Sequence, residues 1–252
     1  ADNAPPVITV RGNMACLAKS FVAIVGSRNA SLSGIKLTKQ LAADIGKCGY
    51  STVSGLARGI DPAAHQASLA HRTVAIFAGG IDHIYPKEND RLAEEIVAQG
   101  GALISEMPLG WTPRAQDFPR RNRIVAGMAL GLIVVEAAKR SGSLISARLA
   151  NEMGRLVFAV PGSPLDPRSE GTNQLIRQGA TLITSAHDVV DEIEPLSRES
   201  DQTGYSLLET GRYEEESEPS DSDREKLLSA LDRTPTSVDE LVRFLDLPPS
   251  RL

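Results

Sequence analysis

The sequence predicts an α/β protein built on an open, doubly wound, mostly parallel β-sheet. Between Phe21 and Ile193 one unit repeats: a short apolar run rich in β-branched residues, a turn rich in Gly, Ser, Pro and Asn, and a segment with helical spacing. Most of the runs are continuously apolar, which is typical of strands that are covered on both faces. These observations favour a sheet with helices on both sides.

Seven runs are expected to form the parallel strands. An eighth strand would allow a closed (β/α)₈ barrel, and Val7–Val10 could supply it, but its connection to Phe21 is too short for a full helix. The open sheet is therefore the preferred arrangement and the barrel is the alternative. The seven expected strands are Val22–Gly26, Ser51–Ser54, Thr73–Ala78, Ala102–Ser105, Leu132–Glu136, Leu156–Val160 and Thr181–Thr184.

Polar residues predict where several helices begin. Ser31 or Ser33 precedes an apolar helical pattern, Asp61 followed by proline has the composition of an N-cap and first turn, and the Asn89-Asp90 pair precedes another helix. The loops before these helices follow the carboxyl ends of strands. In open α/β sheets ligands bind at that edge, so the chemistry is expected in these loops.

The composition is that of an ordinary globular protein. The 252 residues are 41% hydrophobic and 23% charged, enough for one large α/β domain and a small appendage. The two cysteines have no C-x-x-C spacing and the four histidines are scattered, so neither a disulfide framework nor a zinc site is expected. No other metal and no cofactor is expected. No apolar run approaches the ~20 residues that cross a bilayer, and no signal-peptide pattern is present. A cytoplasmic protein without a membrane partner is expected.

The net charge of −5 conceals two oppositely charged parts. Residues 1–186 hold 20 Lys and Arg against 14 Asp and Glu, whereas residues 187–252 hold 7 against 18. The N-terminal part is therefore basic, with a net charge of +6, and the remainder is acidic, with −11. A basic globular part can bind phosphates even when the whole chain is acidic.

The composition changes after Glu194. Ser, Glu, Asp, Thr and Gly dominate there, including the run Glu214-Glu215-Glu216, which indicates an acidic flexible linker. Asp223–Leu231 and Val238–Leu245 then predict two short amphipathic helices that look like the opening of a helix-turn-helix module. The expected division is a sheet domain at 1–194, a linker at 195–222 and a partial helical module at 223–252.

Two turns have the composition of anion-binding sites. Gly26-Ser27-Arg28 follows the first parallel strand and leads into a helix, so its backbone N–H groups and the Arg28 guanidinium can bind a phosphate. Ser141-Gly142-Ser143 opens a later helix in the same way, directly after a Lys-Arg pair. Neither G-x-G-x-x-G nor a Walker motif is present, which disfavours NAD and nucleoside triphosphates. The alternative is a pair of ordinary strand-to-helix turns.

The densest cationic segment contains Phe118, Arg120, Arg121, Asn122 and Arg123. Arginines bind a phosphate backbone while an exposed aromatic ring stacks on a base, a combination used for single-stranded nucleic acid. In the alternative interpretation Phe118 is a core anchor and the arginines form a solvated helix face.

Glu106 and Glu136 end two of the expected strands and could form a catalytic carboxylate pair. Such a pair needs a suitable separation and a raised pKa, which the sequence does not reveal. The nucleophile-elbow motif G-x-S-x-G is absent.

In combination, these motifs resemble the DNA-processing protein A family (DprA, also called Smf), and the resemblance covers roughly residues 7–193. The motifs that carry it are Gly26-Ser-Arg28, Ser54-Gly-Leu-Ala-Arg-Gly-Ile-Asp61, Tyr85-Pro-Lys-Glu-Asn89, Ser105-Glu-Met-Pro108, Phe118-Pro-Arg-Arg-Asn-Arg123, Ser141-Gly-Ser143, Val157-Phe-Ala-Val-Pro-Gly162 and Gly171-Thr-Asn-Gln-Leu-Ile176. Residues 223–252 resemble the first part of the winged-helix module of many members.

The resemblance implies an extended Rossmann-like domain that binds single-stranded DNA without sequence preference, forms a homodimer and has no catalytic activity. It further implies protection of incoming DNA and help in loading RecA recombinase during natural transformation. The implied dimer surface lies around Ile176 and Leu182. The implied DNA-binding residues are Gly26, Ser27, Arg28, Lys87, Phe118, Arg120, Arg121, Asn122, Arg123, Ser141, Gly142 and Ser143.

The rival hypothesis is an enzyme, a Rossmann-like nucleotide hydrolase of the lysine-decarboxylase-like (LOG) kind that uses Glu136 or Glu106. The Pro-Gly-Gly-x-Gly-Thr signature of that family is not present: Pro161-Gly162 is followed by Ser-Pro.

Overall fold

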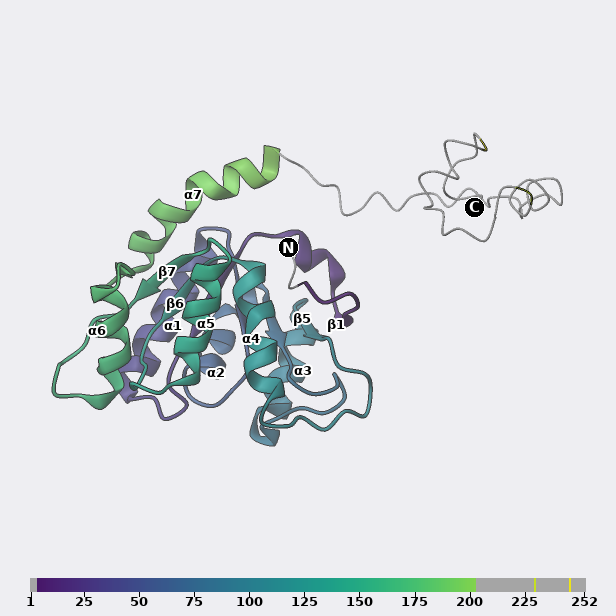
Figure 1. Cartoon of the computed structure of the whole chain (residues 1–252), viewed down its shortest axis with the longest axis horizontal. Coiled ribbons are helices and arrows are strands. Elements are labelled where there is room, and N and C mark those ends of the chain that lie inside the picture. The colour runs from purple at the N-terminus through teal and green to yellow at the C-terminus, as the bar shows by residue number, and fades with distance from the viewer. Residues whose placement is uncertain (1–3, 203–228, 230–244, 246–252) are drawn as a thin grey trace. The chain divides into compact units, whose positions relative to one another are not determined.

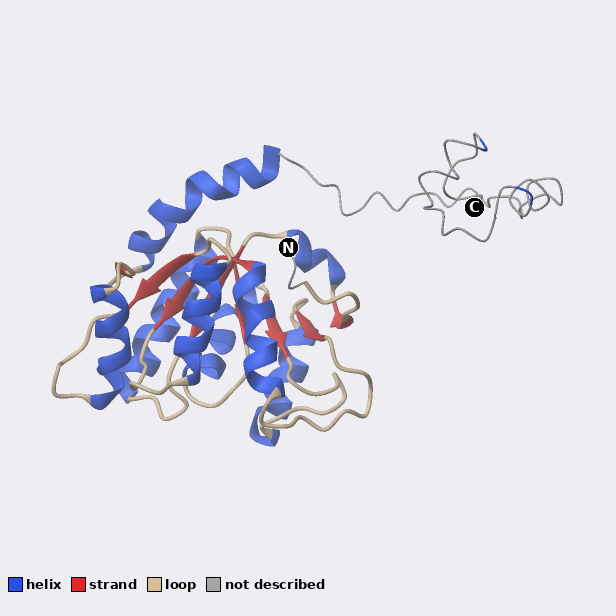
Figure 2. Cartoon of the chain, in the orientation of Figure 1, coloured by secondary structure: helices blue, strands red, loops and turns tan. Residues whose placement is uncertain are grey.

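The structure is a computed structural model that describes residues 4–202 and the single positions 229 and 245. The chain divides into two units, Ala1–Gly204 and Tyr205–Leu252. The described part of the first unit is one β-sheet with helices on both of its faces (Figures 1 and 2).

Eight strands make up the sheet, in the spatial order β1-β5-β4-β3-β2-β6-β7-β8. Neighbours from β5 to β8 are parallel, and only β1 runs antiparallel to its neighbour β5. The strands are β1 (Thr9–Gly12), β2 (Phe21–Val25), β3 (Ser51–Ser54), β4 (Thr73–Ile76), β5 (Ala102–Ser105), β6 (Ala129–Val134), β7 (Leu156–Ala159) and β8 (Thr181–Leu182).

All seven expected strands are present, with ends that differ by up to three residues. The stretch Val7–Val10 does contribute to an eighth strand, but β1 covers the sheet edge and closes no barrel, so the barrel alternative is wrong. The physical reason is the connection: β1 and β2 are joined by the single 3₁₀ turn Met14–Ala18, too short for the helical crossover of a parallel barrel.

Two helical layers cover the sheet. In Figure 1, α4 and α5 lie in front of it and α1 and α2 lie behind it. The helices are α1 (Leu32–Lys47), α2 (Ile60–Ser68), α3 (Asp90–Ala98), α4 (Asp117–Met128), α5 (Gly142–Glu152), α6 (Glu170–Arg177) and α7 (Ala186–Gln202).

Alternation along the buried strands divides the core between the two layers. In β2, Ala23 and Val25 pack in the cluster that contains residues of α4 and α5, while Val22 and Ile24 pack in the cluster that contains residues of α1, α2 and α7. Successive strand side chains point to opposite faces, so a strand that is apolar throughout is buried on both sides.

The helix starts differ from expectation in two places. Ser31 caps α1, since its hydroxyl accepts a hydrogen bond from the Gly34 N–H. The prediction for Asp61 is wrong, because α2 begins one residue earlier, at Ile60. Asn89 does occupy the N-cap position of α3, but its amide donates to the Leu56 carbonyl instead of capping.

Helix α7 reaches Gln202 and so extends into the segment 195–222 that was expected to be a linker. The remainder of that segment lies outside the described residues, as do the two helices expected at 223–231 and 238–245, apart from two positions. Ser229 and Leu245 are both helical.

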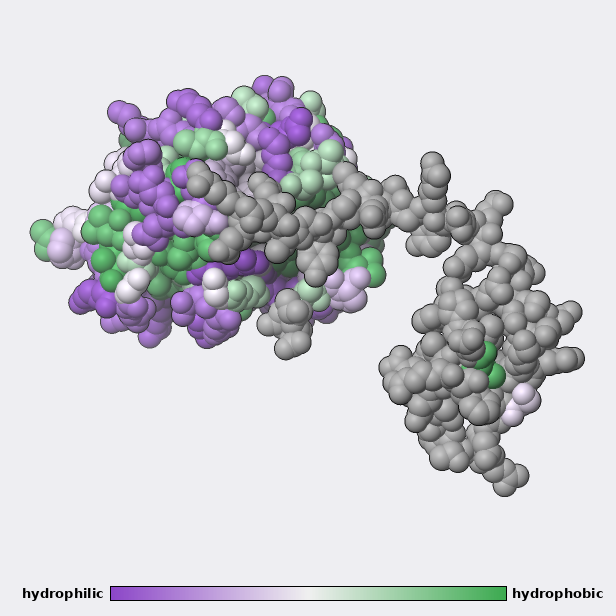
Figure 3. All heavy atoms as spheres, turned by 90° about the horizontal axis from the view of Figure 1, so that it is seen from above, coloured by the Kyte–Doolittle hydropathy of each residue, from purple (hydrophilic) through white to green (hydrophobic). Residues whose placement is uncertain are grey.

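Hydrophilic side chains cover much of the described surface visible in Figure 3, with apolar side chains in patches between them. None of the helices in the described residues combines the length and the apolar character that a membrane span needs.

The order of the strands creates a switch point between β2 and β6. From β2 the chain proceeds to β3 on one side, whereas from β6 it proceeds to β7 on the other side. The loops that leave the carboxyl ends of β2 and β6 therefore diverge and open a crevice, the usual binding position in this fold class.

Candidate nucleic-acid interface

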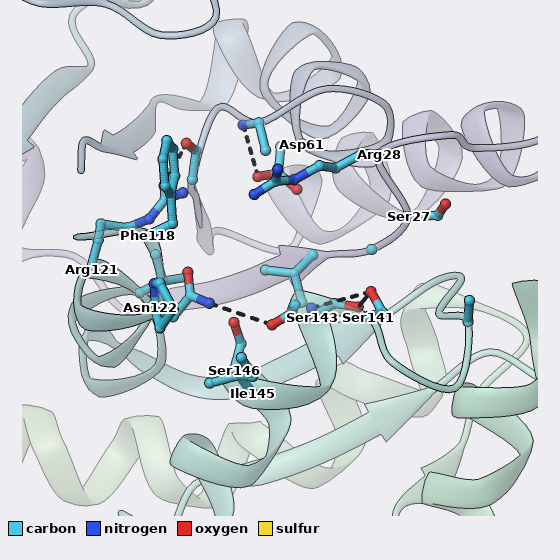
Figure 4. Close-up of a pocket in the computed structure, with 18 of the residues that line it drawn as sticks. Ser27, Arg28, Asp61, Phe118, Arg121, Asn122, Ser141, Ser143, Ile145 and Ser146 are labelled. Carbon is cyan, nitrogen blue, oxygen red and sulfur yellow. Dashed lines mark hydrogen bonds between the residues drawn. The ribbon is translucent and has the colours of Figure 1, made fainter. Parts of the chain in front are cut away.

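A cavity of about 680 Å³, here called the central pocket, lies at this switch point (Figure 4). Its walls come from the loops after β2, β3 and β6 and from the N-terminal parts of α4 and α5. Its lining includes Gly26, Ser27, Arg28, Asn29, Asp61, Phe118, Arg121, Asn122, Arg140, Ser141, Gly142, Ser143, Ile145 and Ser146.

The turn after β2 is held by the start of α2. The Ile60 N–H donates to the Ser27 carbonyl at 3.3 Å. Gly59 permits this approach, because its φ is +77° and a Cβ at this position would lie 2.2 Å from the Ser27 oxygen. The backbone of Gly26-Ser27-Arg28 is thus fixed while the Arg28 side chain stays exposed at the pocket.

Arg28 and Phe118 form a composite surface. The guanidinium carbon of Arg28 lies 5.5 Å from the centroid of the Phe118 ring, within the range of a cation–π contact. The edge of the half-buried Phe118 ring also meets Tyr85, with the ring centroids 5.6 Å apart. Phe118 is half-buried and lines the pocket, so it is not a residue of the hydrophobic core, as the alternative interpretation had it.

The N-terminus of α5 forms the opposite wall. Ser141 is the N-cap and its hydroxyl accepts from the Ser143 N–H at 3.3 Å. The Asn122 amide donates to the Gly142 carbonyl at 3.4 Å, which ties α4 to this turn. A helix N-terminus carries a partial positive charge and unpaired N–H groups, and both attract a phosphate. The exposed Arg140 adds a full charge beside them.

Arg121 has a different environment from the other cations of the pocket. The residue is 5% exposed, and its Nη1 donates to the carbonyls of Gly55 and Ile76 at 2.5 Å each. Gly55 is required there, because a Cβ would lie 2.1 Å from that nitrogen. Arg121 therefore connects the carboxyl ends of β3 and β4 from underneath the pocket.

Asp61 is the buried partner charge of Arg121. It is also 5% exposed, and its carboxylate accepts a hydrogen bond from the Ala57 N–H. Burial raises the pKa of Asp61, and the charge of Arg121 opposes that shift. Burial also lowers the pKa of Arg121 to about 10, and Asp61 opposes this shift in turn. Each charge thus favours the ionised form of the other.

His65 of α2 is a third ionisable residue in this region, and it is fully buried. Its Nδ1 is 2.7 Å from the Thr73 hydroxyl, which itself donates to the Thr52 carbonyl. That hydroxyl proton is used in the bond to Thr52, so the His65 Nδ1 carries the proton of its contact with Thr73. Burial, assisted by the Arg121 charge, lowers the pKa of His65 to about 3.

The predicted arginine cluster is divided between two faces of α4. Arg121 and Asn122 line the pocket, whereas Arg120 and Arg123 contact the buried carboxylate of Glu106. The Arg120 Nε lies 2.7 Å from Glu106 Oε1, close enough for an ion pair but not aligned as a hydrogen bond. At 100° per residue, four consecutive helical residues cannot all face one cavity.

Neither glutamate of the enzyme hypothesis lines the central pocket. Glu106 binds the two arginines, and Glu136 accepts hydrogen bonds from the N–H and the hydroxyl of Ser31 at 3.0 and 2.5 Å. Glu136 thereby stabilises the N-terminus of α1.

Lys87 is exposed in the turn before α3 and does not line the central pocket. Its neighbour Pro86 lines a smaller adjoining cavity of about 410 Å³ that shares Arg28 and Phe118 with the central pocket.

Sequence reasoning did not select Arg140 or Asp61 as site residues. Arg140 directly precedes a predicted anion turn, which was the available signal; nothing local marked Asp61 as the partner of an arginine 60 positions away.

The comparisons with known proteins agree with this architecture. Residues 1–194 match the model of the DNA recombination-mediator protein A family, and residues 213–252 match that of the DprA winged helix domain. Protein Smf of Escherichia coli is 43% identical over 192 residues, which are 75% of this chain and 51% of that protein. The chain thus spans about half the length of this relative.

Two solved structures are similar. DNA processing protein A from Streptococcus pneumoniae superposes with a TM-score of 0.71 at 44% identity, covering 75% of this chain and 67% of that one. The structure of DNA processing protein A from Helicobacter pylori, described with its single-stranded DNA binding mode, gives 0.71 at 31% identity, covering 76% and 88%.

Replacing Arg121 by Met is expected to lower the free energy of unfolding by about 3–5 kcal/mol, because Asp61 is left buried without its counter-charge. Arg121→Met should destabilise the protein clearly less when Asp61 is already replaced by Asn. Urea denaturation of the parent, the two single variants and the double variant measures the interaction energy between the two charges. Arg120→Met on the same helix is the control and should cost less than about 1 kcal/mol. An equal cost of Arg121→Met in both backgrounds would show that the charges are not coupled.

The buried neutral His65 predicts a loss of stability in acid. Its folded pKa of about 3 lies below the usual 6.5, so the unfolded state binds a proton first as the pH falls. The stabilisation present above pH 6.5 should be lost at up to ~1.4 kcal/mol per pH unit on the way down to pH 3. The free energy of unfolding, measured by urea denaturation at pH 7 and pH 5, should fall less with pH for His65→Asn than for the parent. For the exposed His83→Asn it should fall as much as for the parent. An equal loss of unfolding free energy between pH 7 and pH 5 in the parent and in His65→Asn would contradict the lowered pKa of His65.

Proposed function

The chain belongs to the DNA recombination-mediator protein A family, and from that premise we propose that its sheet domain binds single-stranded DNA in the central pocket without preference for base sequence. The observation that carries this proposal is the placement of the Arg28 guanidinium against the Phe118 ring, facing a helix N-terminus across the pocket. A phosphate and an adjacent base need these two chemistries side by side.

In the proposed complex the DNA backbone follows the cationic walls. Arg28, Arg140 and the N–H groups at Ser141–Ser143 bind phosphate oxygens, while a base stacks on Phe118. Every base has a π-face and every nucleotide has a phosphate, so such contacts do not discriminate between sequences. Among the described residues, neither Arg28 nor Arg140 has an ion-pair partner that would compete with a phosphate.

The arginines of α4 receive different roles in this proposal. Arg121 positions the loop after β3 from below, since its guanidinium is buried and hydrogen-bonded to carbonyls. Arg120 and Arg123 already bind Glu106, so any DNA contact by them depends on displacing that carboxylate. Lys87 contributes charge from the neighbouring turn.

The wider proposal follows from the family. We propose a sheet domain at 1–194, an acidic linker at 195–222, whose first residues form the end of α7, and part of a winged-helix module at 223–252. We further propose that a cytoplasmic homodimer protects incoming DNA and helps load RecA recombinase during natural transformation, without catalysis of its own.

Arg28→Ala should weaken binding to oligo-dT and flatten its salt dependence. The slope of log affinity against log salt should decrease by ~0.7 for each phosphate that Arg28 neutralises. Fluorescence anisotropy at several salt concentrations, with oligo-dT and a duplex of equal length, measures both effects. Arg91→Ala is the matched control, because Arg91 is an exposed arginine that pairs with Glu95 away from the pocket.

An equal slope of log affinity against log salt for the parent and Arg28→Ala would show that Arg28 neutralises no phosphate. Absence of binding by the parent at low salt would overturn the proposed function itself.

We propose that the homodimer forms through the surface around Ile176 and Leu182, so one charged substitution there should halve the molecular mass in solution. Leu182 in β8 is 48% exposed, so Leu182→Glu should leave the fold intact and convert a dimer to a monomer. Sedimentation equilibrium at micromolar concentration measures the mass. Leu165→Glu, at a leucine that is 93% exposed on a loop, is the control and should stay dimeric. A monomeric parent would contradict this surface.

A further inference from the structure

The function proposed above leaves the smaller cavity beside the central pocket without an occupant. This adjoining cavity, of about 410 Å³, is within the size range of sites that enclose a small ligand. Arg28 and Phe118 line both cavities, whereas Arg58, Tyr85 and Pro86 line the adjoining cavity alone. A strand bound at Arg28 and Phe118 therefore has a second cavity directly beside it.

The adjoining cavity lies on the side of the central pocket away from the proposed dimer surface. Its walls come from the loop after β3 and from the segment between β4 and α3. Ile176 and Leu182 belong to α6 and β8, at the opposite end of the strand order. A strand that continues into the adjoining cavity does not meet that surface.

The segment that carries Tyr85 is fixed to the loop after β3. The Asn89 amide donates to the Leu56 carbonyl at 2.9 Å, and the Asn89 N–H donates to the Pro86 carbonyl at 3.0 Å. The partly buried Ile84 packs against the apolar core, whereas Tyr85 itself is 54% exposed. The neighbours of Tyr85 therefore hold its ring at the cavity, and the fold does not depend on burying that ring.

The cations of the adjoining cavity are largely engaged. The Arg58 Nε donates to Glu88 Oε1 at 2.9 Å, and the Arg121 Nη1 donates to two backbone carbonyls. Among the described residues that line this cavity, Arg28 is the one arginine without such a partner, and the proposed function already assigns it to a phosphate. The cavity therefore offers no additional free cation for a second phosphate.

Two aromatic rings of this cavity offer separate stacking faces. The centroids of Tyr85 and Phe118 are 5.6 Å apart, and the planes of the rings are inclined by 61°. A base that lies flat on one ring cannot lie flat on the other at that angle. A strand that uses both rings must therefore place a different base on each.

We propose that the adjoining cavity is a second base subsite, in which the nucleotide next to the one on Phe118 stacks its base on Tyr85. The inference rests on the proposed function, because it adds one nucleotide to the same bound strand. Arg28, which lines both cavities, binds the phosphate between the two nucleotides. Stacking on a ring face accepts any base, so the second subsite adds affinity without sequence preference.

The first test is the affinity of Tyr85→Ala for oligo-dT of about 16 nucleotides, measured by fluorescence anisotropy. Binding should weaken roughly 5- to 150-fold, which is the range for one base stacked on an aromatic side chain. The slope of log affinity against log salt should equal that of the parent, because the ring carries no charge. Tyr85→Phe keeps the ring and should bind as the parent does.

A strand of the same length with phosphates and sugars but no bases separates stacking from a general defect. The parent and Tyr85→Ala should bind this abasic strand equally, because there is no base to stack. Loss of the fold or of the dimer would weaken binding of both strands. Met14→Ala is the matched control, at a side chain that is 69% exposed in the 3₁₀ turn before β2, and it should equal the parent on both strands.

Combining Tyr85→Ala with Phe118→Ala tests whether Tyr85 binds a base of its own. The loss of oligo-dT affinity caused by Tyr85→Ala should persist in the Phe118→Ala background, because each ring holds a different base. A Tyr85 that merely positions the Phe118 ring would have no effect once that ring is absent.

Four results would overturn the second base subsite. They are an unchanged oligo-dT affinity of Tyr85→Ala, an equal loss on the abasic strand, a Tyr85→Phe protein as weak as Tyr85→Ala, and a loss that disappears in the Phe118→Ala background. Failure of the parent to bind oligo-dT would instead overturn the proposed function, and the inference with it.

Discussion

A buried guanidinium is costly unless carbonyl oxygens and an opposite charge offset its loss of solvation, and Arg121 imposes that constraint on the loops around the central pocket. Its Nη1 binds the carbonyls of Gly55 and Ile76, and its charge faces Asp61. Asp61 in turn binds the Ala57 N–H. The carboxyl ends of β3 and β4 are therefore held by Arg121, the first turn of α2 carries the opposite buried charge of Asp61, and α2 fixes the turn that presents Arg28. The exposed binding surface depends on a charge that itself touches little solvent.

This arrangement separates two uses of arginine. Arg120 and Arg123 contact the Glu106 carboxylate and Arg121 binds two carbonyls, while Arg28 and Arg140 have no ion pair among the described residues. Only the second group is available to a phosphate without breaking an existing contact. These cations of the central pocket belong to a part of the chain, residues 1–186, that is basic, whereas the net charge of the whole chain is −5.

Rigid backbone at this edge also serves binding, because contacts that are already formed need not be ordered when the ligand arrives. Leu56 has a φ of +52°, an uncommon conformation for a leucine, and its carbonyl is held by the buried amide of Asn89. Glu136 holds the start of α1, and Ser141 holds the start of α5. Asn89, Glu136 and Ser141 thus each fix a loop or a helix start at this edge of the sheet.

The sequence by itself determined the α/β class, seven of the eight strands within three residues at each end, the Ser31 cap and the two turns at Gly26–Arg28 and Ser141–Ser143 that line the central pocket. These features depend on local patterns, since continuous apolar runs encode strands buried on both faces and a small polar residue before a helix encodes its cap. Tertiary structure alone decided that β1 is antiparallel, that Asp61 is a buried charge opposite Arg121 and not a cap, that Asn89 holds the β3 loop, and that only part of the arginine cluster faces the pocket. Each of these outcomes depends on a partner far along the chain, such as Glu106 for Arg123 or Gly55 for Arg121, and a residue's own neighbours in sequence do not specify which distant group packing brings to it.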